Sequence, residues 1–88
     1  MHVEVVGAVQ GVGFRWFIRE QARTLHVGGW ARNRDDGALE VAARGEAGAL
    51  EALRAAVQSG PLGAHVAAVR DLPPIEESEL PETFSIVR

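Results

Sequence analysis

Residues 2–25 read HVEVVGAVQGVGFRWFIREQARTL, and within them the hydrophobic period changes from two to between three and four. The segment from His2 to Val9 alternates like a strand with one buried face, which comprises Val3, Val5, Gly7 and Val9. From Phe14 the spacing is helical, and the apolar stripe comprises Phe14, Phe17, Ile18, Ala22 and Leu25. Gly11 and Gly13 separate the two patterns and allow backbone angles closed to other residues. The stretch therefore predicts a strand, a tight glycine turn and an amphipathic helix.

Beyond this stretch, turn and period signals predict the remaining elements. A glycine just past the last helical turn favours a left-handed helix cap at Gly28 or Gly29. Two antiparallel strands are expected around the turn Asp35–Gly37, and a second helix is expected to end at Gly60. Two further strands follow, separated by a loop rich in proline and glutamate. In chain order, the predicted ranges are Trp30–Arg34, Leu39–Arg44, Glu46–Ser59, Val66–Leu72, Pro73–Pro81 and Thr83–Arg88.

The predicted order of elements is β-α-β-β-α-β with a short additional strand at the end. Two helices are too few to cover both faces of a five-stranded sheet, so the economical packing places both on one face. This is the ferredoxin-like, or split βαβ, arrangement of an α+β protein with a mainly antiparallel sheet. The chain length of 88 residues predicts a single domain, residues 1–88. Such a fold leaves function open, because it hosts enzymes, RNA binders and regulatory modules.

The composition excludes several classes of site. The chain has no cysteine, which removes disulfides, thiolate nucleophiles and cysteine-based metal sites. The net charge of −3 argues against broad binding to nucleic acids or acidic membranes. No apolar run approaches the roughly 20 residues that span a bilayer, and the start of the chain lacks the basic segment of a secretory signal. We therefore expect a cytoplasmic protein.

The segment from Val9 to Arg15 carries the strongest chemical signal. Glycines at Gly11 and Gly13 let successive backbone N–H groups point to one centre, and a helix N-terminus adds further free N–H groups. Such a place binds anions, and Arg15 adds a planar fork that can hold two phosphate oxygens. At about 4 Å and an effective dielectric near 20, that charge pair is worth about 4 kcal/mol before desolvation. The alternative is a simple tight turn with Arg15 on the helix surface.

The second signal is Asn33, which stands at the end of a predicted strand beside the hairpin turn. Its amide can both donate to and accept from a water molecule, although an asparagine near a turn more commonly caps the backbone. We expect turn formation rather than metal binding from Asp35 and Asp36. We expect solvated side chains at Arg32, Arg34, His2, His26 and His65. We also expect Gln10 to hold the loop backbone, and Trp16 either to pack in the core, which we favour, or to flank the pocket.

The sequence resembles the acylphosphatase family. Gly7–Arg15, GAVQGVGFR, resembles the first signature of that family, and Gly29–Leu39, GWARNRDDGAL, resembles the second. Two signatures in this order are much more specific than either alone. Two departures are visible, since Ala8 stands where arginine is frequent and Leu39 where valine is usual. We expect the first departure to affect the charge of the pocket and the second to affect only packing.

The resemblance implies hydrolysis of the carboxyl–phosphate bond of acyl phosphates. It gives Arg15 the phosphate-binding role and Asn33 the role of orienting the attacking water. The phosphate site it implies comprises Gln10, Gly11, Val12, Gly13, Phe14 and Arg15. A carboxylate is a good leaving group, so no general acid is required, and we expect neither a metal nor another cofactor. The expected partner is a small acyl phosphate substrate. We expect the protein to be a monomer.

Two other functions remain open from the sequence. The chain could be a non-catalytic ferredoxin-like module that binds a ligand or RNA, although few aromatic residues are available for the open face of its sheet. It could also be a carbamoyl-phosphate-hydrolysing domain of a larger maturation enzyme, which would share both signatures. Because the predicted fold spans the whole sequence, we expect a free-standing protein. The sequence does not identify the physiological acyl phosphate.

Overall fold

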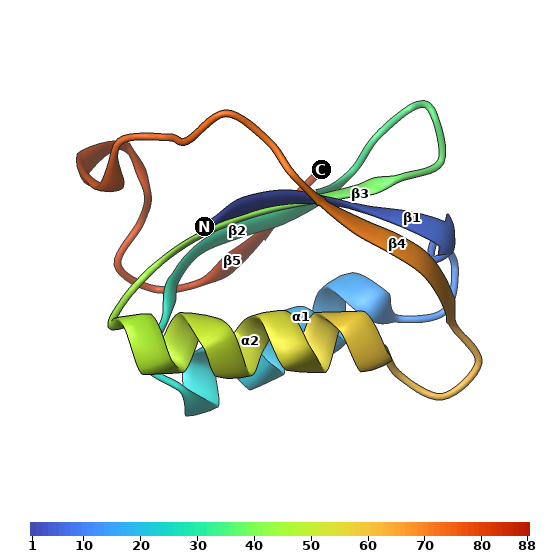
Figure 1. The fold of residues 1–88 in the computed structure, drawn as a ribbon, viewed down its shortest axis with the longest axis horizontal. Helices are drawn as coiled ribbons and strands as arrows, with labels where there is room; N and C mark the ends of the chain where they lie inside the picture. Colours follow the sequence, from blue (N-terminus) through green and yellow to red (C-terminus); the bar gives the residue numbers. More distant parts are fainter.

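The structure is a computed structural model that describes residues 1–88, and its sheet has the strand order β4-β1-β3-β2-β5. Both helices lie on one face of this sheet (Figure 1). The predicted ferredoxin-like arrangement is confirmed. The elements in chain order are β1 (His2–Ala8), α1 (Phe14–Thr24), β2 (Gly28–Asn33), β3 (Leu39–Arg44), α2 (Ala47–Ser59), β4 (His65–Asp71) and β5 (Ser85–Val87).

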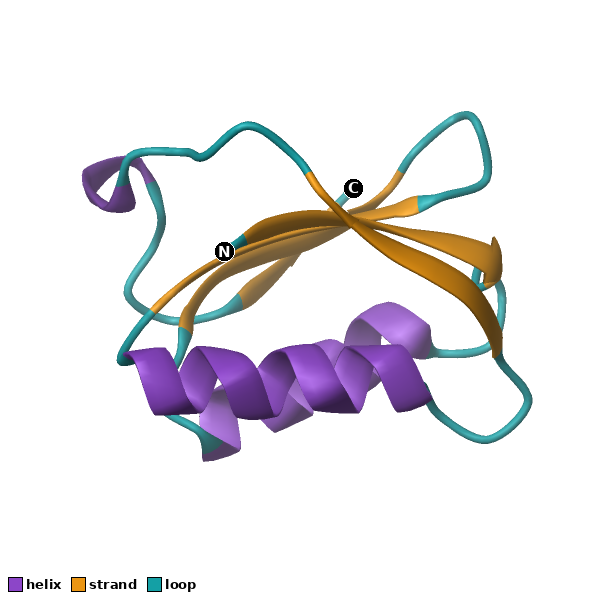
Figure 2. Cartoon of the chain, viewed as in Figure 1, coloured by secondary structure: helices purple, strands orange, loops and turns teal.

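The sheet is antiparallel except at one edge. β1 pairs with both β3 and β4, and β2 pairs with β3, all in antiparallel register. The short strand β5 lies parallel to β2, with Ile86 opposite Ala31. The long loop between β4 and β5 contains a single 3-10 turn, Glu77–Glu79, and it passes over the end of the sheet remote from the β1–α1 loop (Figure 2). The chain therefore returns to the sheet edge beside β2 only in its last few residues.

The core lies between the sheet and the two helices. The helical stripe behaves largely as predicted, because Phe14, Ile18 and Ala22 are buried and Leu25 packs at the edge. Phe84, just before β5, is completely buried in the same cluster. Burying a side chain of this size contributes on the order of 2 kcal/mol, so α1 is firmly held against the sheet. Its first turn is anchored in the core by the buried side chain of Phe14.

The cap of α1 differs from the prediction. His26, not a glycine, takes the left-handed conformation after the helix, with a φ of 57°. Gly28 and Gly29 instead belong to β2, where a Cβ atom at either position would collide with backbone carbonyl oxygens. These glycines are therefore explained by close approach of neighbouring chain segments.

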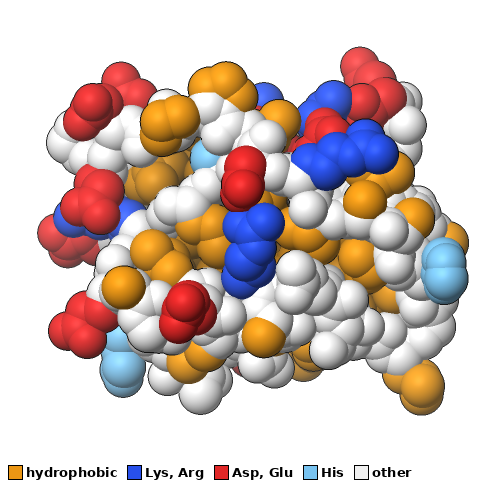
Figure 3. Space-filling model, viewed as in Figure 1, with side chains coloured by type: hydrophobic (Ala, Val, Ile, Leu, Met, Phe, Trp, Pro, Cys, Tyr) orange, Lys and Arg blue, Asp and Glu red, His pale blue; other side chains and the backbone are white.

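The open face of the sheet carries ion pairs around Glu40 and Glu4. Glu40 is only 8% exposed, because the His2 ring and the guanidinium of Arg32 contact its carboxylate. The predicted surface position of His2 is wrong, since its other ring nitrogen lies 2.6 Å from the carbonyl of Pro73. Figure 3, which views the sheet nearly edge-on, shows arginine and carboxylate side chains beside one another and no continuous basic patch in that view.

Candidate active site

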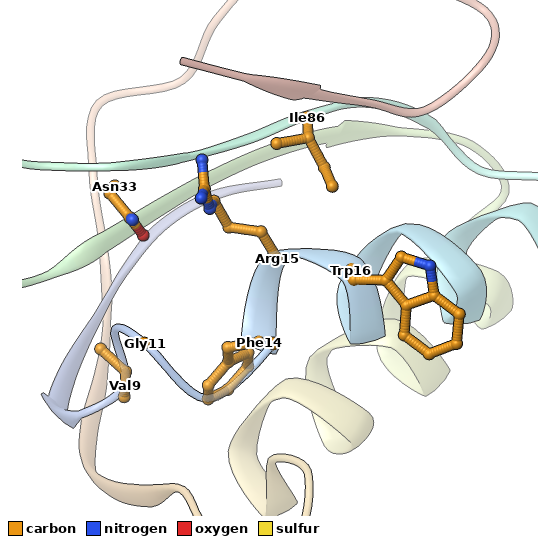
Figure 4. Close-up of a pocket in the computed structure, with 8 residues that line it drawn as sticks. Val9, Gly11, Phe14, Arg15, Trp16, Asn33 and Ile86 are labelled. Atoms are coloured by element: carbon orange, nitrogen blue, oxygen red, sulfur yellow. The ribbon is translucent and has the colours of Figure 1, made fainter.

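A pocket of about 160 Å3 opens where the β1–α1 loop meets the end of β2. Its lining comprises Val9, Gly11, Gly13, Phe14, Arg15, Trp16, Asn33 and Ile86. Figure 4 shows the Arg15 guanidinium between the side chains of Asn33 and Ile86. The two side chains selected separately from the sequence, Arg15 and Asn33, therefore line one pocket.

The β1–α1 loop leaves a run of backbone N–H groups without protein partners. Gly11 and Gly13 adopt left-handed φ angles of 79° and 73°, which turn the chain sharply into α1. No N–H group from Gln10 to Gly13 donates a hydrogen bond to the protein. The first helical hydrogen bond of α1 is the one that the Phe17 N–H donates to the Gly13 carbonyl at 3.0 Å. The loop and the helix start thus offer several amide donors in one region, as an anion site requires.

Arg15 is half-buried, and its guanidinium makes no hydrogen bond or ion pair with the protein. Every other arginine except the C-terminal Arg88 makes a hydrogen bond or an ion pair with a carboxylate or a backbone carbonyl. A partly buried cation without a counter-charge attracts an anion strongly, because less water remains to screen it. The pocket is therefore electropositive through Arg15 and the free amides together.

Asn33 is the last residue of β2, opposite Leu39 on β3. Its side chain is exposed to solvent, lines the pocket and makes no hydrogen bond within the protein. The alternative role of capping the turn is taken by Asp36, whose carboxylate accepts a hydrogen bond from the Ala38 N–H at 3.1 Å. The Asn33 amide is consequently free to bind a water molecule or a ligand.

Gln10 lies in the loop between β1 and α1, residues 9–13, which we call the glycine loop. Its side chain connects this loop to the hairpin that carries Asn33. Its side-chain amide donates to the carbonyl of Arg34 at 2.8 Å and to the carbonyl of Ala38 at 3.1 Å. The Gln10 side chain does hold backbone, but the prediction that it holds the backbone of its own loop is wrong, because both carbonyls belong to the hairpin. This contact fixes the position of the loop relative to Asn33.

Ion pairs of Arg34 also hold the same hairpin, both to β1 and within its own turn. The predicted solvation of Arg34 is wrong, because this side chain binds Glu4 of β1 at 2.8 Å and also contacts Asp36. The hydrogen bond to Glu4 is the main cause that raises the pKa of Arg34 above its ordinary value. The Ala38 N–H, followed by Arg34, lowers the pKa of Asp36. Arg32 is likewise engaged, with Glu40 and with the face of Trp30.

Several residues of the predicted phosphate loop do not face the pocket with their side chains. Val12 is outside the lining and packs against the core, and the Phe14 ring is almost fully buried. The expected core packing of Trp16 is wrong, because this side chain is 57% exposed at the pocket. Ile86 of β5 also lines the pocket. Sequence reasoning missed Ile86, since nothing in the local pattern places the last strand beside the glycine loop.

The family model described as acylphosphatase matches residues 1–86. The chain belongs to the acylphosphatase family. A relative named acylphosphatase from Bifidobacterium longum is 47% identical over 79 residues, covering 88% of this chain and 81% of that protein. One of the same name from Thermococcus kodakarensis is 42% identical over 86 residues, covering 98% and 92%. The crystal structure of acylphosphatase from Bacillus subtilis has a TM-score of 0.85 at 37% identity, covering 99% of this chain and 96% of that one.

These similarities confirm the predicted activity, hydrolysis of acyl phosphates, and the assignment of the chain as an enzyme. They agree with the fold as well, since the two acylphosphatase structures from Bacillus subtilis and Coxiella burnetii superpose over almost the entire chain. Neither helix has the length and apolar character needed to cross a bilayer. No cluster of three or more histidine, aspartate or glutamate side chains forms a metal-binding group.

Proposed function

We propose that the enzyme hydrolyses acyl phosphates by direct attack of one water molecule on a phosphoryl group bound between the glycine loop and Arg15. The proposal is supported by one observation above all. Free backbone amides, an unpartnered guanidinium and an unpartnered asparagine amide line the same small pocket.

The phosphoryl group is bound by the loop N–H groups and by the Arg15 guanidinium. Charge in the transition state of phosphoryl transfer is spread over the three non-bridging oxygens. Donors held in place before the reaction stabilise that charge without having to reorganise. The left-handed turns at Gly11 and Gly13 and the buried Phe14 ring keep these donors in place. This part of the site therefore provides both affinity and transition-state stabilisation.

The attacking water is bound by the side-chain amide of Asn33. Its oxygen forms the new bond to phosphorus, while the bond between phosphorus and the bridging oxygen breaks and the carboxylate leaves with the electron pair. The proton of the water passes to a non-bridging phosphate oxygen. The products are a carboxylate and inorganic phosphate. No protein acid is needed at the leaving group, because the conjugate acid of a carboxylate has a pKa near 4.

The test is hydrolysis of benzoyl phosphate by the purified protein in the presence of EDTA. We expect turnover that inorganic phosphate inhibits competitively, because product phosphate occupies the same loop. Inorganic phosphate should also raise the melting temperature, since a ligand that binds only the folded state stabilises it. Absence of turnover, or full loss of turnover on chelation, would contradict the proposed mechanism.

The alternative of an RNA-binding module receives little support from the open face of the sheet. RNA-binding ferredoxin-like domains expose aromatic side chains on that face for stacking with bases. Here the only aromatic side chain of β2, Trp30, packs against Arg32 and the His2 ring. The carboxylates of Glu4 and Glu40 also lie opposite each other on β1 and β3. These carboxylates already pair with Arg32, Arg34 and Arg70, so those arginines are not free to bind a phosphate backbone.

A further inference from the structure

The pocket has a polar side and an apolar side. The polar side consists of the loop amides, Arg15 and Asn33, all of which the proposed reaction uses. On the other side the accessible apolar side chains are those of Trp16 and Ile86 (Figure 4). Val9 and Phe14 also line the pocket, but both are almost completely buried and offer little surface to a ligand. The reaction at phosphorus gives the two accessible apolar side chains no role.

Trp16 is unusual among the large side chains of this protein. The other tryptophan, Trp30, contacts the guanidinium of Arg32 at 5.0 Å and packs edge-on against the ring of His2. Trp16 makes neither kind of contact and remains 57% exposed beside an electropositive pocket. An exposed aromatic ring at a pocket can bury its surface against a bound ligand, which is a favourable change.

The direction of the reaction places the acyl group on this apolar side. In phosphoryl transfer, the attacking oxygen and the leaving oxygen lie roughly in line through phosphorus. With the attacking water on Asn33, the leaving carboxylate must point away from Asn33. Ile86 is paired with Ala31, two residues before Asn33 on the neighbouring strand. Standard strand rise and spacing then separate the Cα atoms of Ile86 and Asn33 by roughly 8 Å, and the Arg15 guanidinium, which binds the phosphoryl group, lies between their side chains.

The size of the pocket also requires the acyl group to reach its mouth. A cavity of about 150 Å3 holds one benzene molecule, and the pocket here encloses about 160 Å3. A phosphoryl group and its attacking water fill much of that volume. An acyl group larger than acetyl therefore extends past Arg15, where the side chains of Ile86 and Trp16 lie (Figure 4).

We infer that Trp16 and Ile86 form the binding site for the acyl group, and that the enzyme selects acyl phosphates with bulky apolar acyl groups. Benzoyl phosphate represents the preferred class, and acetyl and carbamoyl phosphates represent the disfavoured class. The inference rests on the proposed function, because it requires the phosphoryl group to be bound at the glycine loop. Contacts of this kind lie far from the reacting phosphorus and stabilise the substrate and the transition state equally, so they lower KM rather than raise kcat.

The experiment compares benzoyl phosphate with acetyl phosphate in wild type, Trp16→Ala, Trp16→Phe and Leu62→Ala. Leu62 is a matched control, since it is a fully exposed apolar side chain outside the pocket. In Trp16→Ala we expect KM for benzoyl phosphate to rise about tenfold, so that the ratio of kcat/KM for the two substrates falls by about the same factor. Trp16→Phe should recover most of the ratio, and Leu62→Ala should match wild type.

A second readout does not depend on turnover. Benzoylphosphonate, a non-hydrolysable analogue, should bind wild type more tightly than acetylphosphonate in calorimetry, and Trp16→Ala and Ile86→Ala should each reduce that preference. An unchanged ratio in Trp16→Ala, or equal losses for both substrates, would overturn the inference while leaving the proposed function intact. If wild type hydrolysed neither substrate, the proposed function itself would fail.

Discussion

The side-chain amide of Gln10 donates a hydrogen bond to the backbone carbonyl of Arg34 at 2.8 Å, and so joins the glycine loop to the hairpin that carries Asn33. The same amide also donates to the carbonyl of Ala38 at 3.1 Å. The two halves of the pocket come from separate parts of the chain, and Gln10 fixes their relative position. Placement of this kind is valuable in catalysis, since a displacement of about 1 Å can reduce a rate by about 100-fold.

Replacing Gln10 with alanine should therefore impair catalysis more than binding. We expect kcat for benzoyl phosphate to fall roughly tenfold, while the inhibition constant of inorganic phosphate changes by less, because the loop amides and Arg15 remain. Loss of two hydrogen bonds should also lower the free energy of unfolding by about 1–2 kcal/mol. An unfolding free energy that falls with kcat unchanged would show that the contact is only structural.

Asn33→Ala tests the binding of the attacking water. We expect kcat to fall by about 10²–10³, the usual loss for a single transition-state donor, with inorganic phosphate still bound. Steady-state kinetics with benzoyl phosphate and phosphate inhibition measure the two effects separately. Robust turnover in Asn33→Ala would refute the assignment of Asn33.

Arg15→Ala tests the phosphate site. At about 4 kcal/mol for the charge pair, we expect kcat/KM to fall by about a thousandfold and protection by inorganic phosphate in thermal melts to disappear. Arg15→Lys restores the charge but not the planar fork, so its activity should lie between the two. Arg54→Ala is the matched control, because it removes a guanidinium that pairs with Asp71 on the surface. If Arg54→Ala lost as much activity as Arg15→Ala, the loss would reflect overall charge.

Glycine substitutions distinguish glycines that are needed for a left-handed backbone angle from glycines that are needed because another backbone segment lies too close. Gly13 has a left-handed φ of 73° and open space where a Cβ would lie, so Gly13→Ala should cost only about 1–2 kcal/mol of unfolding free energy. At Gly29 a Cβ would lie 2.0 Å from the Ala42 carbonyl oxygen, so Gly29→Ala should prevent stable folding. Gly48, near the start of α2, has open space and no left-handed angle, so Gly48→Ala should stabilise the protein slightly. Urea unfolding followed by circular dichroism ranks the three variants, and any other order would contradict these explanations.

The lowered pKa of Glu40 predicts that the folded protein becomes less stable in acid. Burial raises the pKa of Glu40, but the hydrogen bonds from His2 and Arg32 outweigh it and leave the pKa below its ordinary value. The stabilisation is therefore fully present above the unfolded pKa of about 4.3 and is lost as pH falls through the lower folded pKa. We expect the urea midpoint to fall between about pH 5 and pH 3.

Glu40→Gln provides the control for this pH dependence. The variant should be less stable than wild type at neutral pH and should lose less further stability on acidification. Part of the loss should remain, because the pKa of Asp36 is also lowered. An equal acid-induced loss in wild type and Glu40→Gln would exclude Glu40 as its source.

The elements of the fold could be predicted from the sequence because they depend on local signals. The change of period after Val9, the glycine turn and the Asp35–Gly37 hairpin each act over a few residues, and the structure agrees with all three. The cap of α1 could not be predicted in this way. Gly28 and Gly29 resemble capping residues, but the carbonyl oxygens that exclude a side chain there come from distant segments, among them Pro81 and Ala42.

The same division applies to the active site. Sequence by itself determined the family, and it predicted the loop donors, Arg15 and Asn33 as site groups, since each stands in a short motif whose chemistry depends on residue type and local backbone. Tertiary structure alone decided that these groups line one pocket, that Gln10 holds the hairpin, and that Trp16 and Ile86 line the same pocket. The reason is that β5 reaches β2 through pairing between residues far apart in the chain, and no local pattern encodes which distant backbone a strand edge will bind.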